Sequence, residues 1–147
     1  MKNLIEAQIL WQKKNGTFTD NLDSLVLFIK NDPIVDSVRK AVDTVRVGAD
    51  SIFLRSADPF KPLLDFNFRK VAFSPDSITH APRSGQLYIV QIDTTTNVDS
   101  VVTPSGKLLR VDTSIVIGST YYIEDPDGYG TVGDTKNLAL KNTSSWD

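Results

Sequence analysis

Acidic side chains crowd into one glycine-rich stretch near the end of the chain, residues 124–134. Its carboxylates belong to Glu124, Asp125, Asp127 and Asp134. No Lys or Arg lies between Val111 and Thr135 to neutralise them. Carboxylates this close repel one another unless they stay solvated or share a cation, and glycines let the backbone turn and aim its carbonyl oxygens inward. Ca²⁺ prefers such oxygen ligands, so the stretch predicts ion binding rather than catalysis.

The spacing Asp125-x-Asp127-Gly128 is similar to that of calcium loops, which often place a glycine directly after two carboxylates two residues apart. The stretch is not an EF-hand, because the third Asp and the closing Glu of that pattern are missing. The candidate metal ligands are Asp125, Asp127, Asp134 and Glu124. The predicted cofactor is a structural Ca²⁺ ion, and an acidic, solvated turn without an ion is the alternative.

Residues suited to catalysis are scarce in this chain. His80 is the only histidine, and the serines near it form no recognisable nucleophile motif. There is no cysteine, which excludes disulfides, thiolate nucleophiles and cysteine-ligated zinc. Asp125 and Asp127 could form the paired carboxylates of a hydrolase, but many solvated acid pairs share that spacing. We therefore expect a protein that is not an enzyme, with an acidic-dyad hydrolase as the contrary hypothesis.

Composition narrows the remaining classes of function. A chain of 147 residues is long enough for one domain with a sizeable core. Its net charge of −2 argues against a nucleic-acid partner, because such proteins usually carry a basic face. No apolar run approaches the roughly 20 residues that span a bilayer, and no signal peptide is visible after Met1.

The first part of the chain predicts helices. A stripe of Leu4, Ala7, Leu10 and Trp11 at helical spacing predicts a core-facing helix over residues 2–14, ended by Asn15-Gly16. Thr19 or Asp20 should cap a second helix, whose stripe is Leu22, Leu25, Val26 and Ile29. Asp32 and Pro33 should begin a third. Its stripe would be Val35, Val38, Ala41, Val42 and Val45, although this β-branched run also suits a strand.

Short runs rich in β-forming residues follow, separated by turn residues. The predicted strands are Val45–Val47, Ser51–Leu54, Phe66–Phe73, Gln86–Asp93, Ser100–Val102, Lys107–Val111, Ser114–Ile117 and Thr120–Ile123. Ser105-Gly106 predicts a hairpin turn and Gly118-Ser119 a bend. Helices followed by an antiparallel sheet predict an α+β fold in a single domain, 1–147. Its parts would be helical (1–45), β-rich (46–123) and an acidic, glycine-rich tail (124–147).

Two separated regions resemble the pseudopilins of type II secretion systems. The first contains Ala7, Trp11, Asn15-Gly16-Thr17-Phe18-Thr19, Leu22 and Leu25. In pseudopilins an amphipathic helix ends in a glycine, followed by an aromatic residue and a short leucine-containing helix. The second contains Tyr121-Tyr122, Asp127-Gly128, Gly130, Gly133, Asp134 and Trp146, and it resembles the tail of the major pseudopilin. The chain also resembles pseudopilin-like envelope proteins of the Bacteroidetes.

The resemblance implies a pilin-like fold and a structural or assembly subunit of an envelope secretion or pilus-like system. Such a subunit is anchored in the membrane through an N-terminal segment that this sequence lacks, with its globular part on the periplasmic or extracellular side. Its partners would be other pilin-like subunits or secretion-system proteins. Carried over by position, Asp127 and Asp134 would ligate calcium, with Asp125 or Glu124 as a further ligand. The alternative function is an extracellular module that binds a glycan or a partner protein.

Overall fold

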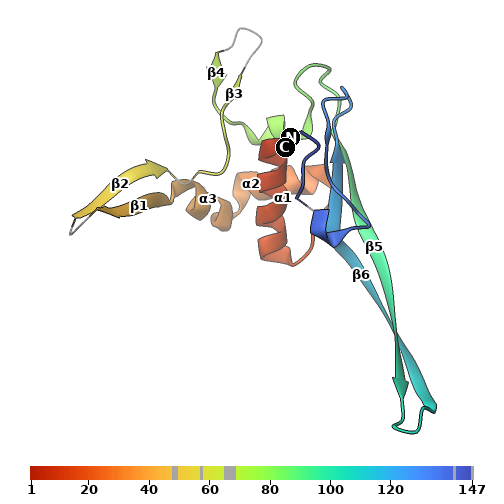
Figure 1. Ribbon diagram of the computed structural model, residues 1–147. Helices are drawn as coiled ribbons and strands as arrows, with labels where there is room; N and C mark the ends of the chain where they lie inside the picture. The colour runs from red at the N-terminus through yellow and green to blue at the C-terminus, as the bar shows by residue number, and fades with distance from the viewer. Residues whose placement is uncertain (48–49, 57, 65–68, 141, 147) are drawn as a thin grey trace.

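The first helix, α1 (Lys2–Asn15), lies at the centre of the computed structural model, with the other elements arranged around it (Figure 1). The structure describes residues 1–47, 50–56, 58–64, 69–140 and 142–146. Leu4, Ala7 and Leu10 are buried, which confirms the predicted core-facing stripe. The helix ends at Gly16, whose φ of 82° is left-handed and whose N–H donates to the carbonyl of Gln12, as the Asn-Gly pair predicts.

Two further helices follow directly. In α2 (Leu22–Asn31) the N-cap is Asn21, which accepts a hydrogen bond from the N–H of Ser24, so the predicted caps Thr19 and Asp20 were wrong. Thr19 instead accepts from the N–H of Asn21, which fixes the turn before the helix. In α3 (Pro33–Lys40) Asp32 caps the helix and Pro33 occupies its first turn, as predicted.

The third helix is shorter than predicted. It ends at Lys40, and β1 (Val42–Val47) follows and pairs antiparallel with β2 (Asp50–Ser56). Val42 and Val45 therefore belong to a strand, the alternative that the β-branched run also predicted. A smaller hairpin joins β3 (Leu63–Leu64) to β4 (Lys70–Val71). Of the predicted strand Phe66–Phe73, residues 66–68 lie outside the described residues, and η1 (Pro75–Thr79) follows.

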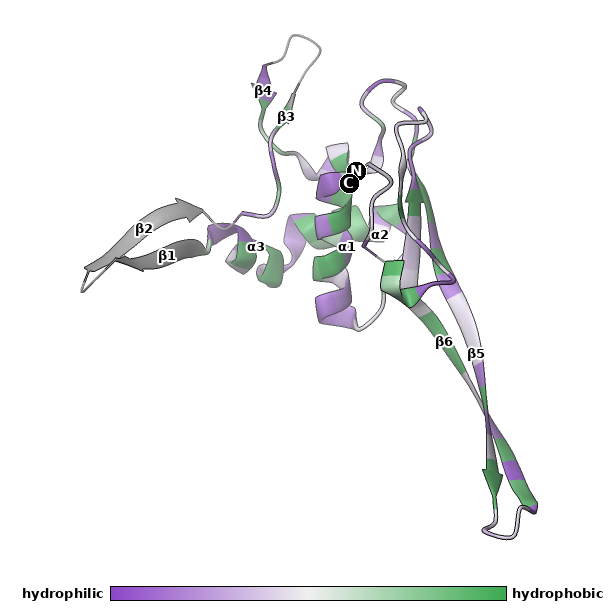
Figure 2. Cartoon of the chain, in the orientation of Figure 1, coloured by the Kyte–Doolittle hydropathy of each residue, from purple (hydrophilic) through white to green (hydrophobic). Residues whose placement is uncertain are grey.

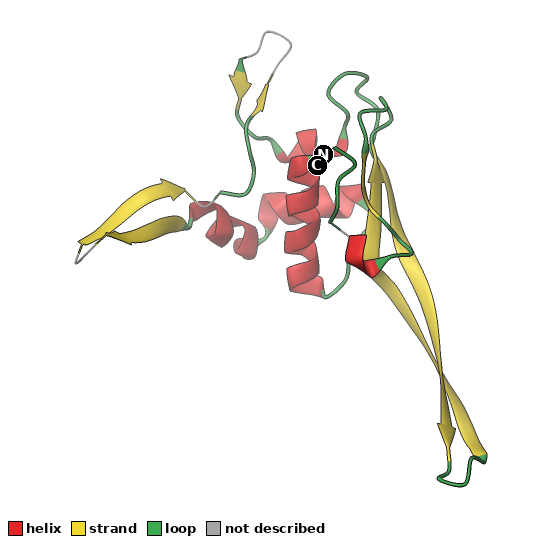
Figure 3. Cartoon of the chain, in the orientation of Figure 1, coloured by secondary structure: helices red, strands yellow, loops and turns green. Residues whose placement is uncertain are grey.

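The last five predicted strands form only two long ones. These are β5 (Ile89–Val102) and β6 (Leu108–Glu124), joined by a turn that contains Ser105-Gly106 as predicted. β7 (Thr131–Gly133) pairs with the last residues of β6, and a short helical turn, η2 (Leu138–Leu140), precedes the end of the chain. In the described part of the chain, β5, β6 and β7 form a three-stranded antiparallel sheet in that order. Helices followed by an antiparallel sheet confirm the α+β class (Figure 3).

The helices and the sheet meet through an aromatic contact next to a glycine. The ring of Phe18, just after α1, lies 4.5 Å from the ring of Tyr121 on β6, and both residues are buried. The N–H of Phe18 donates to the carbonyl of Gly118 at 2.7 Å. Gly118 has a φ of 73°, and a Cβ atom there would lie 2.7 Å from the carbonyl oxygen of Phe18. Only glycine fits this close approach.

The predicted bend at Gly118-Ser119 is a register irregularity within continuous β6. Ile92 pairs with Tyr121 and Thr94 pairs with Ile117, so residues 118–120 of β6 lie opposite Asp93 alone on β5. Its carboxylate accepts hydrogen bonds from the N–H of Thr120 at 2.6 Å, the hydroxyl of Ser119 at 2.7 Å and the hydroxyl of Thr95 at 2.9 Å. Burial alone would raise the pKa of Asp93, but these hydrogen bonds outweigh it and lower the pKa to about 2.

Beyond this irregularity the hairpin projects away from the helices. We call residues 94–117 the arm. Figure 1 shows the arm leaving the body of the molecule, and Figure 2 shows hydrophobic residues along it and near its tip. β7 pairs only with residues 122–124 of β6, so within the described residues both edges of the arm lack a neighbouring strand. The buried core residues all lie outside the arm.

Candidate functional site

The acidic stretch folds into a tight turn between β6 and β7. The carboxylate of Asp125 accepts from the N–H of Asp127 at 2.8 Å, and the carbonyl of Asp125 accepts from the N–H of Gly128 at 3.0 Å. The N–H of Asp125 donates to the carbonyl of Gly130, which closes the turn. Gly128 has a φ of 78°, a conformation that glycine adopts without strain. The Asp-Pro-Asp-Gly sequence therefore forms a turn that is closed by its own hydrogen bonds.

The other predicted metal ligands have separate hydrogen-bond partners. Glu124 accepts from the hydroxyl of Tyr122 at 3.1 Å, and Asp127 accepts from the N–H of Ser84 at 3.1 Å. Asp134 caps a turn of its own by accepting from the N–H groups of Lys136 and Asn137. Across the described residues, no three His, Cys, Asp or Glu side chains lie close enough to share a metal ion. In this conformation the four carboxylates do not form a calcium shell, and calcium binding stays a prediction.

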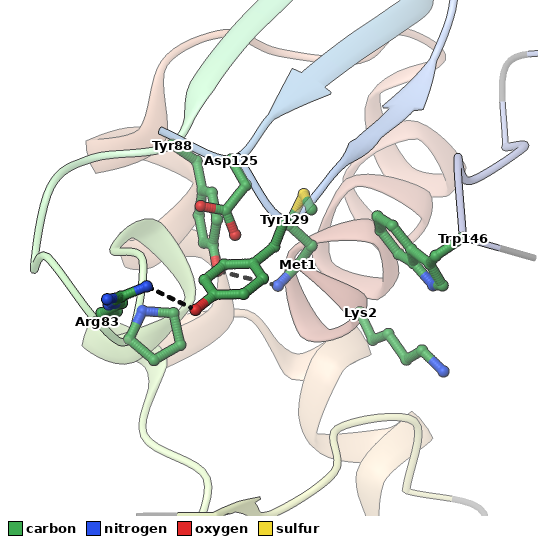
Figure 4. Close-up of a pocket in the computed structure, with 8 residues that line it drawn as sticks. Met1, Lys2, Arg83, Tyr88, Asp125, Tyr129 and Trp146 are labelled. Atoms are coloured by element: carbon green, nitrogen blue, oxygen red, sulfur yellow. Dashed lines mark hydrogen bonds between the residues drawn. The ribbon is translucent and has the colours of Figure 1, made fainter. Parts of the chain in front are cut away.

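The turn forms one wall of a pocket of about 600 Å³ (Figure 4). The residues that line it are Met1, Lys2, Pro82, Arg83, Tyr88, Asp125, Tyr129 and Trp146. They come from the start of α1, the loop before β5, the β6–β7 turn and the end of the chain. Aromatic and aliphatic surface with a few polar groups is the usual lining of a ligand pocket.

Each aromatic residue of the pocket is held in place differently. Tyr88 is buried, whereas Tyr129 is 60% exposed and accepts a hydrogen bond from Arg83 Nη1 at 3.1 Å. Trp146 lies against Gly130, where a Cβ atom would be 2.8 Å from the indole ring. The segment before Trp146 pairs with β7 through hydrogen bonds between Ser145 and Thr131. Tyr129 and Trp146 therefore contribute exposed ring surface to the lining of the pocket.

The polar groups of the pocket include the phenol of Tyr88 and the carboxylate of Asp125, both buried. Burial and the nearby carboxylates of Asp125 and Asp127 raise the pKa of Tyr88 to about 12, so its phenol stays neutral at physiological pH. The phenol oxygen of Tyr88 accepts a hydrogen bond from the backbone nitrogen of Met1 at 3.1 Å. The lining residues include no nucleophile paired with a base, as catalysis by acyl or glycosyl transfer requires.

Sequence patterns identified part of this site and missed the rest. The acidic turn and Trp146 stood out by composition and resemblance, but Pro82, Arg83 and Tyr88 did not. Tyr88 precedes a strand of alternating apolar residues and gives no local sign that it faces a pocket. His80, considered as a base, is exposed, and its Nδ1 lies 2.8 Å from the hydroxyl of Thr79.

Comparisons with known sequences and structures found no match to this chain: no protein-family model, curated protein or solved structure matches it. Among the helices that the structure describes, none is both long and apolar enough to cross a bilayer.

Proposed function

We propose that this protein is a non-enzymatic assembly subunit of an envelope secretion or pilus-like system, with its globular domain outside the cytoplasm. The observation that supports an assembly role is the arm, a long two-stranded hairpin that projects from the body of the molecule. The envelope location and the membrane anchor rest on the resemblance to pseudopilins.

The arm has features of a segment that functions in contact with another protein. A two-stranded hairpin alone in water is at best marginally stable, and natural proteins usually cover or blunt long open strand edges. Here the edges of the arm lack a neighbouring strand in the described structure, and apolar residues on both strands are exposed, among them Val98 and Ile115. A partner that covers the arm would remove both liabilities. Other pilin-like subunits are the partners that we propose.

Photo-crosslinking in the native cells tests the assembly role. Benzoyl-phenylalanine placed at Val98 on the arm should form covalent adducts with neighbouring subunits in the envelope fraction. The matched control is the same residue at Leu27, an equally exposed apolar position on α2 (59% against 60% exposed). Adducts from position 98 but not from position 27 would support the proposal. Equal labelling at both positions, or none at position 98, would contradict it.

Calcium binding by the acidic turn is a separate proposal. It requires Asp134 to leave its own turn and approach Asp127, because the two carboxylates now bind different backbone N–H groups. An ion that binds only the folded state raises the melting temperature. We expect Ca²⁺ to raise the melting temperature relative to EDTA in the wild type but not in Asp127→Asn. Identical melting in Ca²⁺ and EDTA would refute calcium binding.

A second candidate function is glycan recognition in the aromatic pocket. The exposed rings of Tyr129, which lies beside Arg83, and of Trp146 on the other side of Met1 favour it, since flat apolar rings near hydrogen-bonding groups suit a sugar face and its hydroxyls (Figure 4). A glycan array with the wild type and with Trp146→Ala tests this function. Binding that is lost in Trp146→Ala but kept in Leu138→Ala, an exposed apolar residue outside the pocket, would support it. An array without specific binding would exclude it.

A further inference from the structure

The two faces of the arm differ in charge. Residues directly opposite each other in an antiparallel pair point to the same face, and successive pairs alternate between faces. One face is built from the pairs Thr94/Ile117, Thr96/Ile115, Val98/Thr113 and Ser100/Val111. Val102 is next on this face along β5, and it pairs with Leu108 after a register shift that leaves Leu109 as an extra residue of β6. The other is built from Thr95/Val116, Asn97/Ser114, Asp99/Asp112 and Val101/Arg110. The first contains no ionisable residue, and we call it the uncharged face. The second contains Asp99, Asp112 and Arg110, and we call it the charged face.

The uncharged face has the composition of a buried sheet face but is open to solvent. Its six apolar residues are between 49% and 64% exposed, and they are Val98, Val102, Leu108, Val111, Ile115 and Ile117. Antiparallel sheets commonly pack one apolar face and leave a polar face in water. The arm has this two-faced pattern, yet none of the described residues covers the apolar side. Pairing along a strand edge would leave the face exposed, so the pattern indicates that another layer packs on the face itself.

We infer that the partner on the uncharged face is the same face of a second copy of this chain. This inference rests on the proposed assembly role and names the partner. An ion buried without a counter-charge is costly, so the partner surface must also be uncharged, and this chain supplies such a surface. The charges of the arm are balanced, with Asp99 and Asp112 against Lys107 and Arg110, so two arms do not repel each other on net.

The side chains of the uncharged face also suit self-packing. In each of its four pairs before the tip, a Thr or Ser lies opposite an Ile or Val, and the size difference is clearest in Thr96/Ile115 and Ser100/Val111. Large residues of one copy can then lie over small residues of the other, as in sheets packed face to face about 10 Å apart. Such a contact uses the same patch on both copies and closes as a two-fold dimer.

The area of the face predicts a reversible contact. Nine residues at about 3.4 Å each give a face about 30 Å long, and its width is about 10 Å, so two faces together cover roughly 600 Å². Stable protein interfaces usually bury about 1,200–2,000 Å². The pairing of two isolated molecules should therefore be weak and depend on concentration. Copies held side by side in an assembly would pair more readily because their effective concentration is high.

Crosslinking between single cysteines tests the face and the partner together, since the natural chain has no cysteine. Purified Val98→Cys and Ile115→Cys should form crosslinked dimers with a bis-maleimide whose reach matches the sheet spacing of about 10 Å. Asp99→Cys and Ser114→Cys are the matched controls, because each is the neighbouring residue on the charged face of the same strand. We expect dimers from the uncharged face only. Equal yields from both faces, or no dimers, would overturn the inference.

Sedimentation velocity gives a measurement without cysteines. The wild type should show an average mass that rises with concentration, Ile115→Lys should remain monomeric, and Ser114→Lys should behave as the wild type. A wild type that stays monomeric at every concentration would contradict self-packing. If the purified protein does not self-associate but position 98 still crosslinks to a different subunit in cells, the second-copy inference fails and the assembly role stands. If neither contact forms, both fail.

Discussion

Asp93 shows how one residue fixes the root of the arm. Its carboxylate joins β5 to the irregular part of β6 by accepting three hydrogen bonds. An amide at this position could accept at only one atom, so part of this network would be lost. We expect Asp93→Asn to lower the free energy of unfolding at pH 7 by about 2 kcal/mol, measured by urea denaturation. Asp99→Asn, an exposed acid further along β5, is the control and should change it by less than about 0.5 kcal/mol.

The lowered pKa of Asp93 also predicts how stability depends on pH. Its folded-state pKa of about 2 lies below the ordinary value of 3.8. The stabilisation from its ionised form is therefore fully present above about pH 4 and is lost as the pH falls through about 2. We expect the wild type to lose about 1–2 kcal/mol more than Asp93→Asn between pH 4 and pH 2. If the wild type and Asp93→Asn lose the same free energy of unfolding between pH 4 and pH 2, Asp93 is not the source of this pH dependence.

Gly118 provides a test of the contact between helices and sheet. Alanine there would adopt an unfavourable left-handed conformation and would place its Cβ 2.7 Å from the carbonyl oxygen of Phe18. Gly106, at the tip of the arm, has a similar φ of 86° but no atom near its missing side chain. Gly106→Ala should therefore destabilise by about 1 kcal/mol and Gly118→Ala by about 3 kcal/mol, measured by urea denaturation. Equal losses would show that the close approach to Phe18 does not matter.

At the scale of an element, the arm should be separable from the fold. All buried core residues lie outside it, and the pairs from Ile89/Glu124 to Ile92/Tyr121 hold the base of the hairpin. Replacing residues 97–114 with Asn-Gly should close a short hairpin on the pair Thr96/Ile115, because this dipeptide favours a two-residue turn. We expect the free energy of unfolding to change by no more than about 1 kcal/mol. Loss of cooperative thermal unfolding would show that the arm belongs to the folding unit.

Sequence signals predicted the helices better than the hairpins. Gly16 and Asp32 are local signals, and the structure uses both as predicted. The long strands were predicted as fragments, because Thr, Asn and Asp residues in the arm look like turn residues. In the structure their backbones pair across the hairpin while their side chains remain in water. That long-range pairing has no local signal.

The pocket could not have been assembled from the sequence for a related reason. Its lining comes from segments near residues 82–88, near 125–129 and at Trp146, which meet only because β7 and the last residues return beside α1. The acidic turn was visible as a cluster of charges, but its hydrogen bonds depend on the fold. Asp127, for example, accepts from Ser84, which lies in the loop before β5.

At the scale of the whole molecule, both ends of the chain lie together at the pocket. The C-terminal segment that contains Ser145 and Trp146 packs against Gly130. A Cβ atom at Gly130 would lie 2.5 Å from Ser145 Oγ and 2.8 Å from the Trp146 ring. We expect Gly130→Ala to displace this segment and open the pocket. Hydrogen exchange should increase at the N–H groups of Thr131 and Ser145, which now donate to the Ser145 hydroxyl and the Thr131 carbonyl, respectively.

Gly128→Ala is the control, since Gly128 also has a positive φ but has open space around it. Its exchange should stay close to that of the wild type, because only the local backbone strain differs. Similar exchange in the two variants would mean that the contact with Trp146 does not hold the end of the chain in place.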